Sequence, residues 1–248
     1  MSETFKSQIK DLVDDLKAVF THVGLGGEAA EYKLLTQSFL YKFLNDKFLY
    51  QAKAIDASNS YEKLIDMSEE DYSWLLKFIG TSTAWLKPDQ LIESLHRKQN
   101  ESDFYETFEN TLNQIAIDNN DIFSVHTDGD TAIRLFDERL ITDTISDSSK
   151  RNEVAKAIIN LLARVKFDET IFSQGFDFFS TLFEYMIKDY NKDGGGKYAE
   201  YYTPHSVAKI IADILVGDDE PQNVRIYDPS AGSGTLLMNL ASRIGVDK

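Results

Sequence analysis

The chain has 248 residues, enough for one large domain or two modest ones, and 42% of them are apolar, which is sufficient for a sizeable core. Its 41 acidic residues outnumber its 26 basic ones and give a net charge of −15. Because so acidic a surface repels phosphate, the chain by itself is a poor candidate for gripping nucleic acid. The absence of cysteine excludes disulfides, cysteine-ligated metal centres and a thiol nucleophile.

Neither a signal peptide nor a membrane span is indicated. Acidic residues interrupt the apolar ones in the segment 1–16, so it lacks the apolar core of a signal peptide. The longest apolar run, 210–216, contains Asp213 and falls far short of the ~18 residues of a spanning helix. Together with the lack of cysteine, this predicts a cytoplasmic protein without membrane contact.

Helical periodicity dominates the first two thirds of the chain. Apolar residues recur at three- and four-residue steps, the pattern of amphipathic helices whose apolar faces form a core. These stripes occupy residues 5–20, 32–43, 154–165 and 176–190. Ser68 resembles an N-cap before a further helix, and Pro88 is expected to begin another.

Two segments interrupt the helical pattern. Residues 119–130 are polar, and the Asp128-Gly129 pair could close a hairpin, but the flanking residues do not alternate. We therefore expect a loop followed by a helix from about Thr131. The segment 191–197, NKDGGGK, is a linker, because three consecutive glycines cannot hold a helix.

The sequence after this linker predicts a helix, a strand, a glycine-rich turn and a second helix. Thr203 is a candidate N-cap with Pro204 in the first turn, and this helix would end at Gly217. The short run 224–227 reads as a strand, and 235–244 as a helix. A strand, a glycine turn and a helix form the layout of a nucleotide-binding corner, where helix amides face an anionic group.

Four interpretations of this corner are possible: it binds one of three ligands, or it is a tight turn that binds nothing. A dinucleotide requires a third glycine, which does not follow Gly232-Ser233-Gly234 at the right spacing. The phosphate loop of ATP-binding proteins fails as well, because Gly196-Lys197 lacks the flanking residues. S-adenosylmethionine fits better, since Asp228 suits its positive methionine head and the glycines allow close approach. The remaining alternative is a tight turn that binds nothing.

The sequence gives little indication of a metal site or of a catalytic nucleophile. The four histidines are far apart in the sequence, and neither the H-E-x-x-H pattern nor the G-x-S-x-G pattern occurs. We therefore predict neither a metal site nor a catalytic nucleophile.

Two motifs in order resemble those of a known family. DPSAGSGTLL, preceded by KYAEYYTPHSVAKIIADIL, is similar to the modification subunit of type I restriction-modification systems, an N6-adenine DNA methyltransferase. In that resemblance GKYAEYYTP corresponds to the segment that packs over S-adenosylmethionine, and DPSAGSG to the first methyltransferase motif. GGEAAEYKLLTQSFLYKFLNDKF is similar to part of the family's helical domain.

The resemblance implies a set of cofactor-binding residues. Those of the first motif would lie along the cofactor, three residues of the second would form its turn, and one acid would sit near the methionine end. These residues are Glu200, Tyr201, Tyr202, Thr203, Pro204, His205, Asp228, Gly232, Ser233 and Gly234. For Tyr201 and Tyr202, ordinary packing is the alternative, and His205 also suits a plain first-turn helix position.

The resemblance implies a mainly α fold in two parts. A helical N-terminal domain would span 1–165, and 166–248 would form the truncated start of an α/β S-adenosylmethionine-dependent methyltransferase domain. The family's catalytic [N/D]-P-P-[F/Y/W] motif grips the flipped adenine. None of the four prolines is adjacent to another, so this motif does not occur here.

We therefore expect the N-terminal part of an adenine-specific DNA methyltransferase subunit, with half of a cofactor site and no activity alone. The resemblance implies a DNA-specificity subunit and a restriction subunit as partners, with DNA contacted through the assembled complex. The alternative is a helical interaction module that docks the specificity subunit or self-associates, without binding a cofactor.

Overall fold

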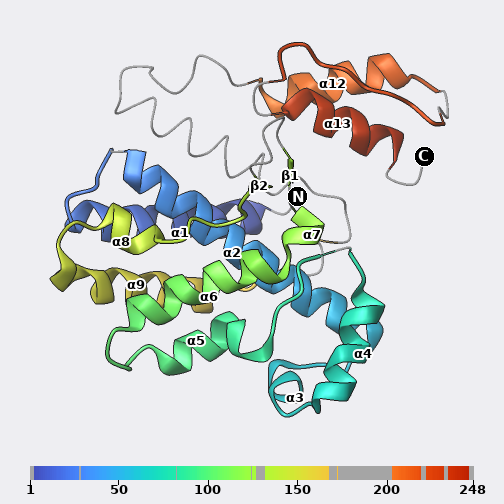
Figure 1. Cartoon of the computed structure of the whole chain (residues 1–248). Coiled ribbons are helices and arrows are strands. Elements are labelled where there is room, and N and C mark those ends of the chain that lie inside the picture. The colour runs from blue at the N-terminus through green and yellow to red at the C-terminus, as the bar shows by residue number, and fades with distance from the viewer. Residues whose placement is uncertain are drawn as a thin grey trace. The chain divides into compact units, whose positions relative to one another are not determined.

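Helices dominate the computed structural model of the chain (Figure 1). It describes residues 3–27, 29–81, 83–123, 125–126, 132–167, 172, 203–218, 222–231 and 234–245. The chain divides into two compact units, Met1–Phe172 and Ser173–Lys248. The sequence-based boundary at 165/166 follows directly on the end of the last helix described in the first unit.

The first unit is built from helices with one short strand pair, and the second contributes two described helices. The elements of the first unit are α1 (Glu3–His22), α2 (Ala29–Ile55), α3 (Tyr61–Ile65), α4 (Glu69–Ile79), the 3-10 turn η1 (Pro88–Gln90), α5 (Ile92–Lys98), α6 (Phe104–Asp118), α7 (Asn120–Phe123), β1 (Val125–His126), β2 (Ala132–Ile133), α8 (Leu140–Thr144) and α9 (Ser148–Arg164). Those of the second are α12 (His205–Val216) and α13 (Thr235–Ile244). The mainly α fold expected from the sequence is confirmed. In the described part of the chain, every helix is too short or too polar to cross a membrane.

Helix α2 lies at the centre of the first unit. It has 27 residues and contacts α1, α4, α8 and α9. Leu35 and Phe39 of the predicted stripe are fully buried, but so are Leu34 and Tyr41 on other sides of the helix. A helix surrounded by others buries more than one face, which is why its sequence shows a weaker single stripe than α1 does.

Helix α9 closes the same core. It packs against α1, α5 and α6, which come from earlier parts of the sequence, and against α8, which directly precedes it. Val154, Ile158 and Leu162 of the predicted stripe are fully buried. Burying such side chains is the main favourable contribution to the stability of a helical unit.

A buried charged cluster joins three elements of this unit. The Lys42 ammonium pairs with the Asp46 carboxylate at 2.9 Å, and both side chains are almost fully buried. Asp46 also accepts hydrogen bonds from Asn45 Nδ2 at 2.8 Å and from the Phe167 amide at 2.9 Å. Asn45 Oδ1 in turn accepts the Ile92 amide at 2.9 Å. The cluster therefore ties α2 to the start of α5 and to the segment that follows α9.

Burial and pairing act in opposite directions on Lys42. Loss of hydration lowers the pKa of its ammonium, and the Asp46 carboxylate partly restores it. A buried charge of this kind is tolerated only with its partner in place.

Local signals set the ends of two elements. The predicted N-cap is confirmed, since Ser68 Oγ accepts the Asp71 amide at 3.1 Å at the start of α4. At Pro88 the expected helix is instead the 3-10 turn η1, and α5 begins only at Ile92. Leu91 between them is extended, because its backbone adopts φ −72° and ψ 146°.

The segment around residue 130 differs from our expectation. Val125 pairs with Ile133, and His126 with Ala132, in an antiparallel two-stranded ladder. The predicted helix from Thr131 is therefore wrong, and the hairpin that we set aside is present. Each strand has only two residues, too few for a period-two alternation to show in the sequence. The Asp128-Gly129 connection lies outside the described residues.

The predicted strand at 224–227 is also wrong. The described residues there form no strand, and the described part of the chain offers no segment paired with it. A strand exists through hydrogen bonds to a neighbour, so an apolar run alone does not make one.

Replacement of Asp46 by Asn should destabilise the first unit by about 3 kcal/mol, because it leaves Lys42 buried without its counter-charge. Urea unfolding followed by circular dichroism would measure the change. Asp143→Asn is the matched control, since Asp143 pairs with Arg139 at the same four-residue spacing but on the surface. Equal losses in the two variants would contradict a structural role for the buried pair.

Candidate functional site

The described residues of both motifs lie in or shortly before α12 and α13, two helices that lie side by side (Figure 1). Ala208, Ala212 and Val216 form the buried stripe of α12, and Thr235 and Asn239 are the buried residues of α13. The alanines leave room for the backbones to approach closely. The two helices thus bury small and polar groups between them, while larger side chains remain outside.

A polar contact joins the first halves of the two helices. Asn239 Nδ2 donates to Nδ1 of His205 at 3.2 Å and to the Thr235 carbonyl at 2.8 Å. Asn239 is buried, so these partners satisfy an amide that would otherwise be costly in the interface. His205 is the first residue of α12, and it is therefore fixed beside the second turn of α13.

A second contact joins the ends of the same helices. Arg243 Nε pairs with Asp213 Oδ1 at 2.9 Å, and Arg243 Nη2 donates to the Gly217 carbonyl at 2.7 Å. The first half of α12 contacts the first half of α13, and the C-terminal end of α12 contacts that of α13. The two helices therefore run in the same direction. Their N-termini consequently lie at the same end of the pair, although the linking segment separates them in the sequence.

The turn before α13 has the geometry that its glycine predicts. Gly234 is the N-cap of α13 with φ +74°, in the left-handed region that favours glycine. Among the described residues other than its chain neighbours, no heavy atom lies within 4 Å of the position that a Cβ would take there. The left-handed backbone, and not crowding by described neighbours, is therefore what favours glycine at this position.

Asp228 supplies the negative charge next to this turn. Its Oδ1 accepts the Ser230 amide at 2.9 Å, which fixes the side chain at the start of the turn. The N-terminal ends of α12 and α13 carry the positive ends of their dipoles. Asp228 precedes α13 in the sequence, and a carboxylate together with a helix N-terminus suits a ligand with both a cationic and an anionic group.

Five of the ten predicted site residues lie among the described ones. Thr203, Pro204, His205, Asp228 and Gly234 are described, and His205 contacts α13 directly. The other five lie outside the described residues: Glu200, Tyr201, Tyr202, Gly232 and Ser233.

The start of α12 differs in detail from its prediction. Pro204, not Thr203, is the N-cap, and no side chain caps the helix. The Pro204 carbonyl accepts the amides of Val207 at 3.0 Å and Ala208 at 3.1 Å, so the helix begins one residue later than expected.

Sequence reasoning missed the residues that hold the pair together. Asn239 and Arg243 lie four residues apart on α13, and both face α12. A polar Asn within an otherwise apolar stretch of α13 was the one available signal, since such a residue needs a partner when buried.

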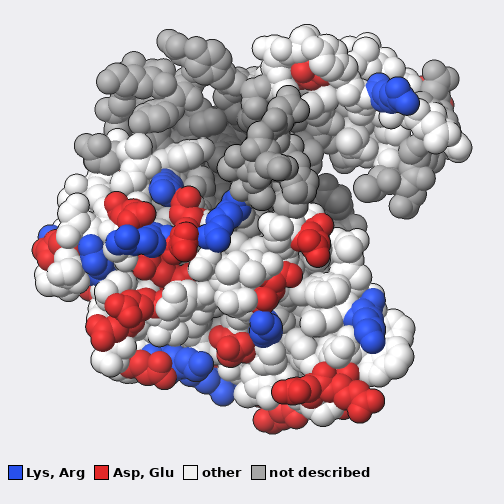
Figure 2. All heavy atoms as spheres, in the orientation of Figure 1, with Lys and Arg blue, Asp and Glu red and all other residues white. Residues whose placement is uncertain are grey.

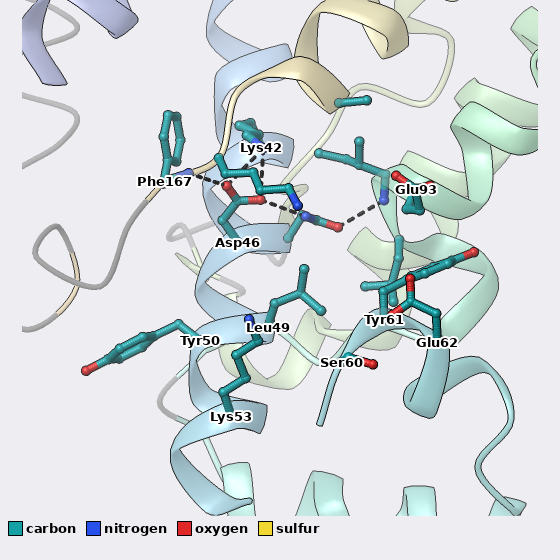
Figure 3. Close-up of a pocket in the computed structure, with 15 residues that line it drawn as sticks. Lys42, Asp46, Leu49, Tyr50, Lys53, Ser60, Tyr61, Glu62, Glu93 and Phe167 are labelled. Atoms are coloured by element: carbon teal, nitrogen blue, oxygen red, sulfur yellow. Dashed lines mark hydrogen bonds and ion pairs between the residues drawn. The ribbon is translucent and has the colours of Figure 1, made fainter. Parts of the chain in front are cut away.

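A cavity of about 490 Å³ lies in the first unit, and none of the described residues of either motif lines it (Figure 3). It is lined by α2, α3, the start of α5 and the end of α9, and Lys42 and Asp46 point toward each other at its wall. Because these buried charges already have partners, the cavity gives no chemical reason to place the motif ligand there. The described residues also contain no group of His, Asp and Glu that could hold a metal ion.

Comparison with known proteins gives one family model and several relatives. Residues 174–248 match the family model N-6 DNA Methylase. The MpnII type I restriction enzyme methylase subunit of Mycoplasma pneumoniae is 23% identical over 98% of this chain and 45% of its own length. The MjaIX type I restriction enzyme methylase subunit of Methanocaldococcus jannaschii is 25% identical over 48% of this chain and 22% of its own.

A solved structure has the same fold. The type I restriction-modification system methyltransferase subunit from Streptococcus thermophilus matches with a TM-score of 0.62 and 22% identity, over 98% of this chain and 50% of that one. The chain thus spans about half the length of the Mycoplasma pneumoniae and Streptococcus thermophilus proteins, each of which matches nearly all of it. The resemblance recognised in the sequence is confirmed.

Replacement of Asn239 by Ala should lower the free energy that stabilises the packing of α12 against α13 by about 1 kcal/mol, because it removes the hydrogen bonds to His205 and Thr235. Amide hydrogen exchange at Ala208 and Ala212 would report the loss as faster exchange. Met238→Ala, one residue away and 61% exposed, is the control and should leave exchange unchanged. Faster exchange in the control alone would contradict the assigned interface.

Proposed function

We propose, from the chain's homology to the methylase subunits of type I restriction enzymes, that the α12–α13 pair belongs to the cofactor site of a DNA methyltransferase. The cofactor is S-adenosylmethionine, and the reaction of the whole enzyme is methyl transfer to adenine N6. The observation that carries the proposal is the shared direction of α12 and α13, because it brings the two motif segments to one end of the pair.

The described residues fit this cofactor chemically. S-adenosylmethionine, when bound, supplies a methyl group activated on a positive sulfonium. Asp228 would attract the positive methionine head, and the amides that begin α13 would face its carboxylate. Gly234 adopts without strain the left-handed backbone from which α13 begins, so that the first amides of the helix can be presented to a ligand.

The proposed cofactor-binding set comprises the residues of both motifs. It consists of Glu200, Tyr201, Tyr202, Thr203, Pro204, His205, Asp228, Gly232, Ser233 and Gly234. His205 has a second role in this proposal, since its bond to Asn239 positions the first motif beside α13.

We assign the helical domain to 1–165 and the beginning of the methyltransferase domain to 166–248. No Asn-Pro-Pro or Asp-Pro-Pro occurs in the 248 residues, so the base-gripping step has no candidate residues here. We therefore propose that the chain alone transfers no methyl group. A net charge of −15 also favours DNA contact through partner subunits, one for DNA specificity and one for restriction.

An interaction module without cofactor binding is the second candidate. It is favoured by the apolar side chains that α12 leaves outside the α12–α13 contact. Ile210, Ile214 and Leu215 are 58%, 75% and 68% exposed. An apolar stripe of this kind usually meets another surface, which could belong to a partner or to a second copy.

Titration of the isotope-labelled chain with S-adenosylmethionine, followed by NMR, tests the cofactor proposal. We expect shifts at amides in the first turns of α12 and α13. Asp228→Ala should weaken binding about tenfold, because it removes the charge that attracts the methionine head. Asp218→Ala is the matched control, since Asp218 is an exposed acid just beyond the C-terminus of α12, and it should bind as the parent chain does.

Two further measurements separate the candidates. NAD and ATP should cause no comparable shifts, and radiolabelled methyl from S-adenosylmethionine should stay at background in DNA. A chain that shows no shift with S-adenosylmethionine would leave the interaction module as the better account. Shifts with NAD at the same amides, or methyl incorporation by the chain alone, would contradict the proposal.

A further inference from the structure

Helix α4 leaves two aromatic side chains in solvent. Trp74 is 53% exposed and Phe78 is 70% exposed, while Tyr72, Leu75 and Ile79 of the same helix are buried. Their four-residue spacing places Trp74 and Phe78 on one side, and their ring centroids are 6.3 Å apart. Paired exposed aromatics are unusual on a free surface and typical of the centre of an interface.

A shallow groove runs beside these rings, between the end of α2 and α4. Its volume is about 830 Å³, and Ile55, Met67, Leu75 and Phe78 supply its apolar lining. Ile55, the last residue of α2, is itself 43% exposed. We call this feature, together with Trp74 at its edge, the α4 groove.

Acidic residues border the α4 groove. Asp56, Asp66 and Asp71 belong to its lining, and Glu69 and Glu70 are exposed in the first turn of α4. The stretch 56–78 contains six acidic residues and two basic ones. Figure 2 shows the corresponding red side chains gathered over the region of α3 and α4.

Both basic residues of this stretch are already engaged. Lys63 pairs with Asp56 at 2.9 Å. The Lys77 ammonium lies 4.9 Å from the Trp74 ring centroid, a cation–π contact. Within the stretch 56–78 the two lysines therefore leave most of the negative charge around the groove uncompensated, and the Lys77 ammonium already lies over the Trp74 ring.

Charge decides which occupant fits. Nucleic acid is repelled by an acidic rim. A second copy that met this groove across a two-fold axis would bring the same acidic rim against itself, which is unfavourable. A basic protein segment is attracted, and an apolar side chain on it would cover the aromatic rings.

We propose that the α4 groove docks a lysine- or arginine-bearing segment of another protein that inserts a large apolar side chain beside Phe78 and Trp74. The basic residues of that segment face Asp66, Glu69 and Glu70. This inference stands on the first unit alone and does not depend on the proposed cofactor site.

Fluorescence anisotropy of a labelled lysine–leucine amphipathic peptide, titrated with the 248-residue chain, tests the proposal. We expect saturable binding that weakens as salt is raised. Phe78→Ala and Trp74→Ala should each raise the dissociation constant about tenfold, as expected for aromatic anchors. Ile117→Ala, a 50% exposed apolar residue on α6, is the matched control and should change it less than about twofold.

A second pair of variants separates the groove from the general acidity of the chain. The double variant Glu69→Gln, Glu70→Gln should weaken binding several-fold, whereas Glu101→Gln, Asp121→Asn, which removes the same charge from exposed sites elsewhere, should not. Thermal unfolding would show that all variants remain folded. The proposal would be overturned if the two charge variants had equal effects or if Phe78→Ala bound the peptide unchanged. Tighter binding of a glutamate–leucine peptide would also overturn it, as would a concentration-dependent dimer that is lost in Phe78→Ala.

Discussion

His205 with Asn239 and Asp213 with Arg243 hold α12 and α13 side by side and in the same direction. The buried Asn239 amide needs its partners, and the exposed Arg243–Asp213 ion pair adds a second contact, so polar groups as well as apolar packing set the register of the two helices. The consequence is that residues separated by a long stretch of sequence share one end of the pair. That end carries two helix N-termini and the left-handed Gly234, and Asp228 lies shortly before Gly234 in the sequence.

The helical unit depends on a different constraint. Asp46 has three partners, two on α2 itself and one in the segment after α9, so that one buried carboxylate fixes the exit from α9 against α2. The connection to α5 passes through Asn45, which links Asp46 to the Ile92 amide. The two units thus rely on separate polar contacts, and the α4 groove belongs wholly to the first.

Features of the fold that depend only on neighbouring residues could be predicted from the sequence. The helix 235–244 was expected at the bounds found, because a glycine turn and an apolar stripe define it. Ser68 caps α4 as expected. The β1–β2 hairpin was missed because two residues per strand carry no period, and the strand at 224–227 was wrong because pairing depends on a neighbour.

The same distinction holds for the candidate site. The motif residues were identified from the sequence, since their types and spacing are local. Asn239 and Arg243 were not, because their roles arise only when α13 meets α12. The exposed Trp74 and Phe78 were likewise indistinguishable from core aromatics, since exposure is a property of the folded unit.

Distances between spin labels on α12 and α13 test the central claim most directly, and the chain has no native cysteine to interfere. Cysteines would replace the exposed Ser206 and Leu215 on α12, in pairs with Met238 or Ser242 on α13. Helices that run in the same direction place 206 closer to 238 than to 242, and 215 closer to 242 than to 238, by up to about 6 Å. The reverse order in both comparisons would contradict the shared end on which the proposed cofactor site depends.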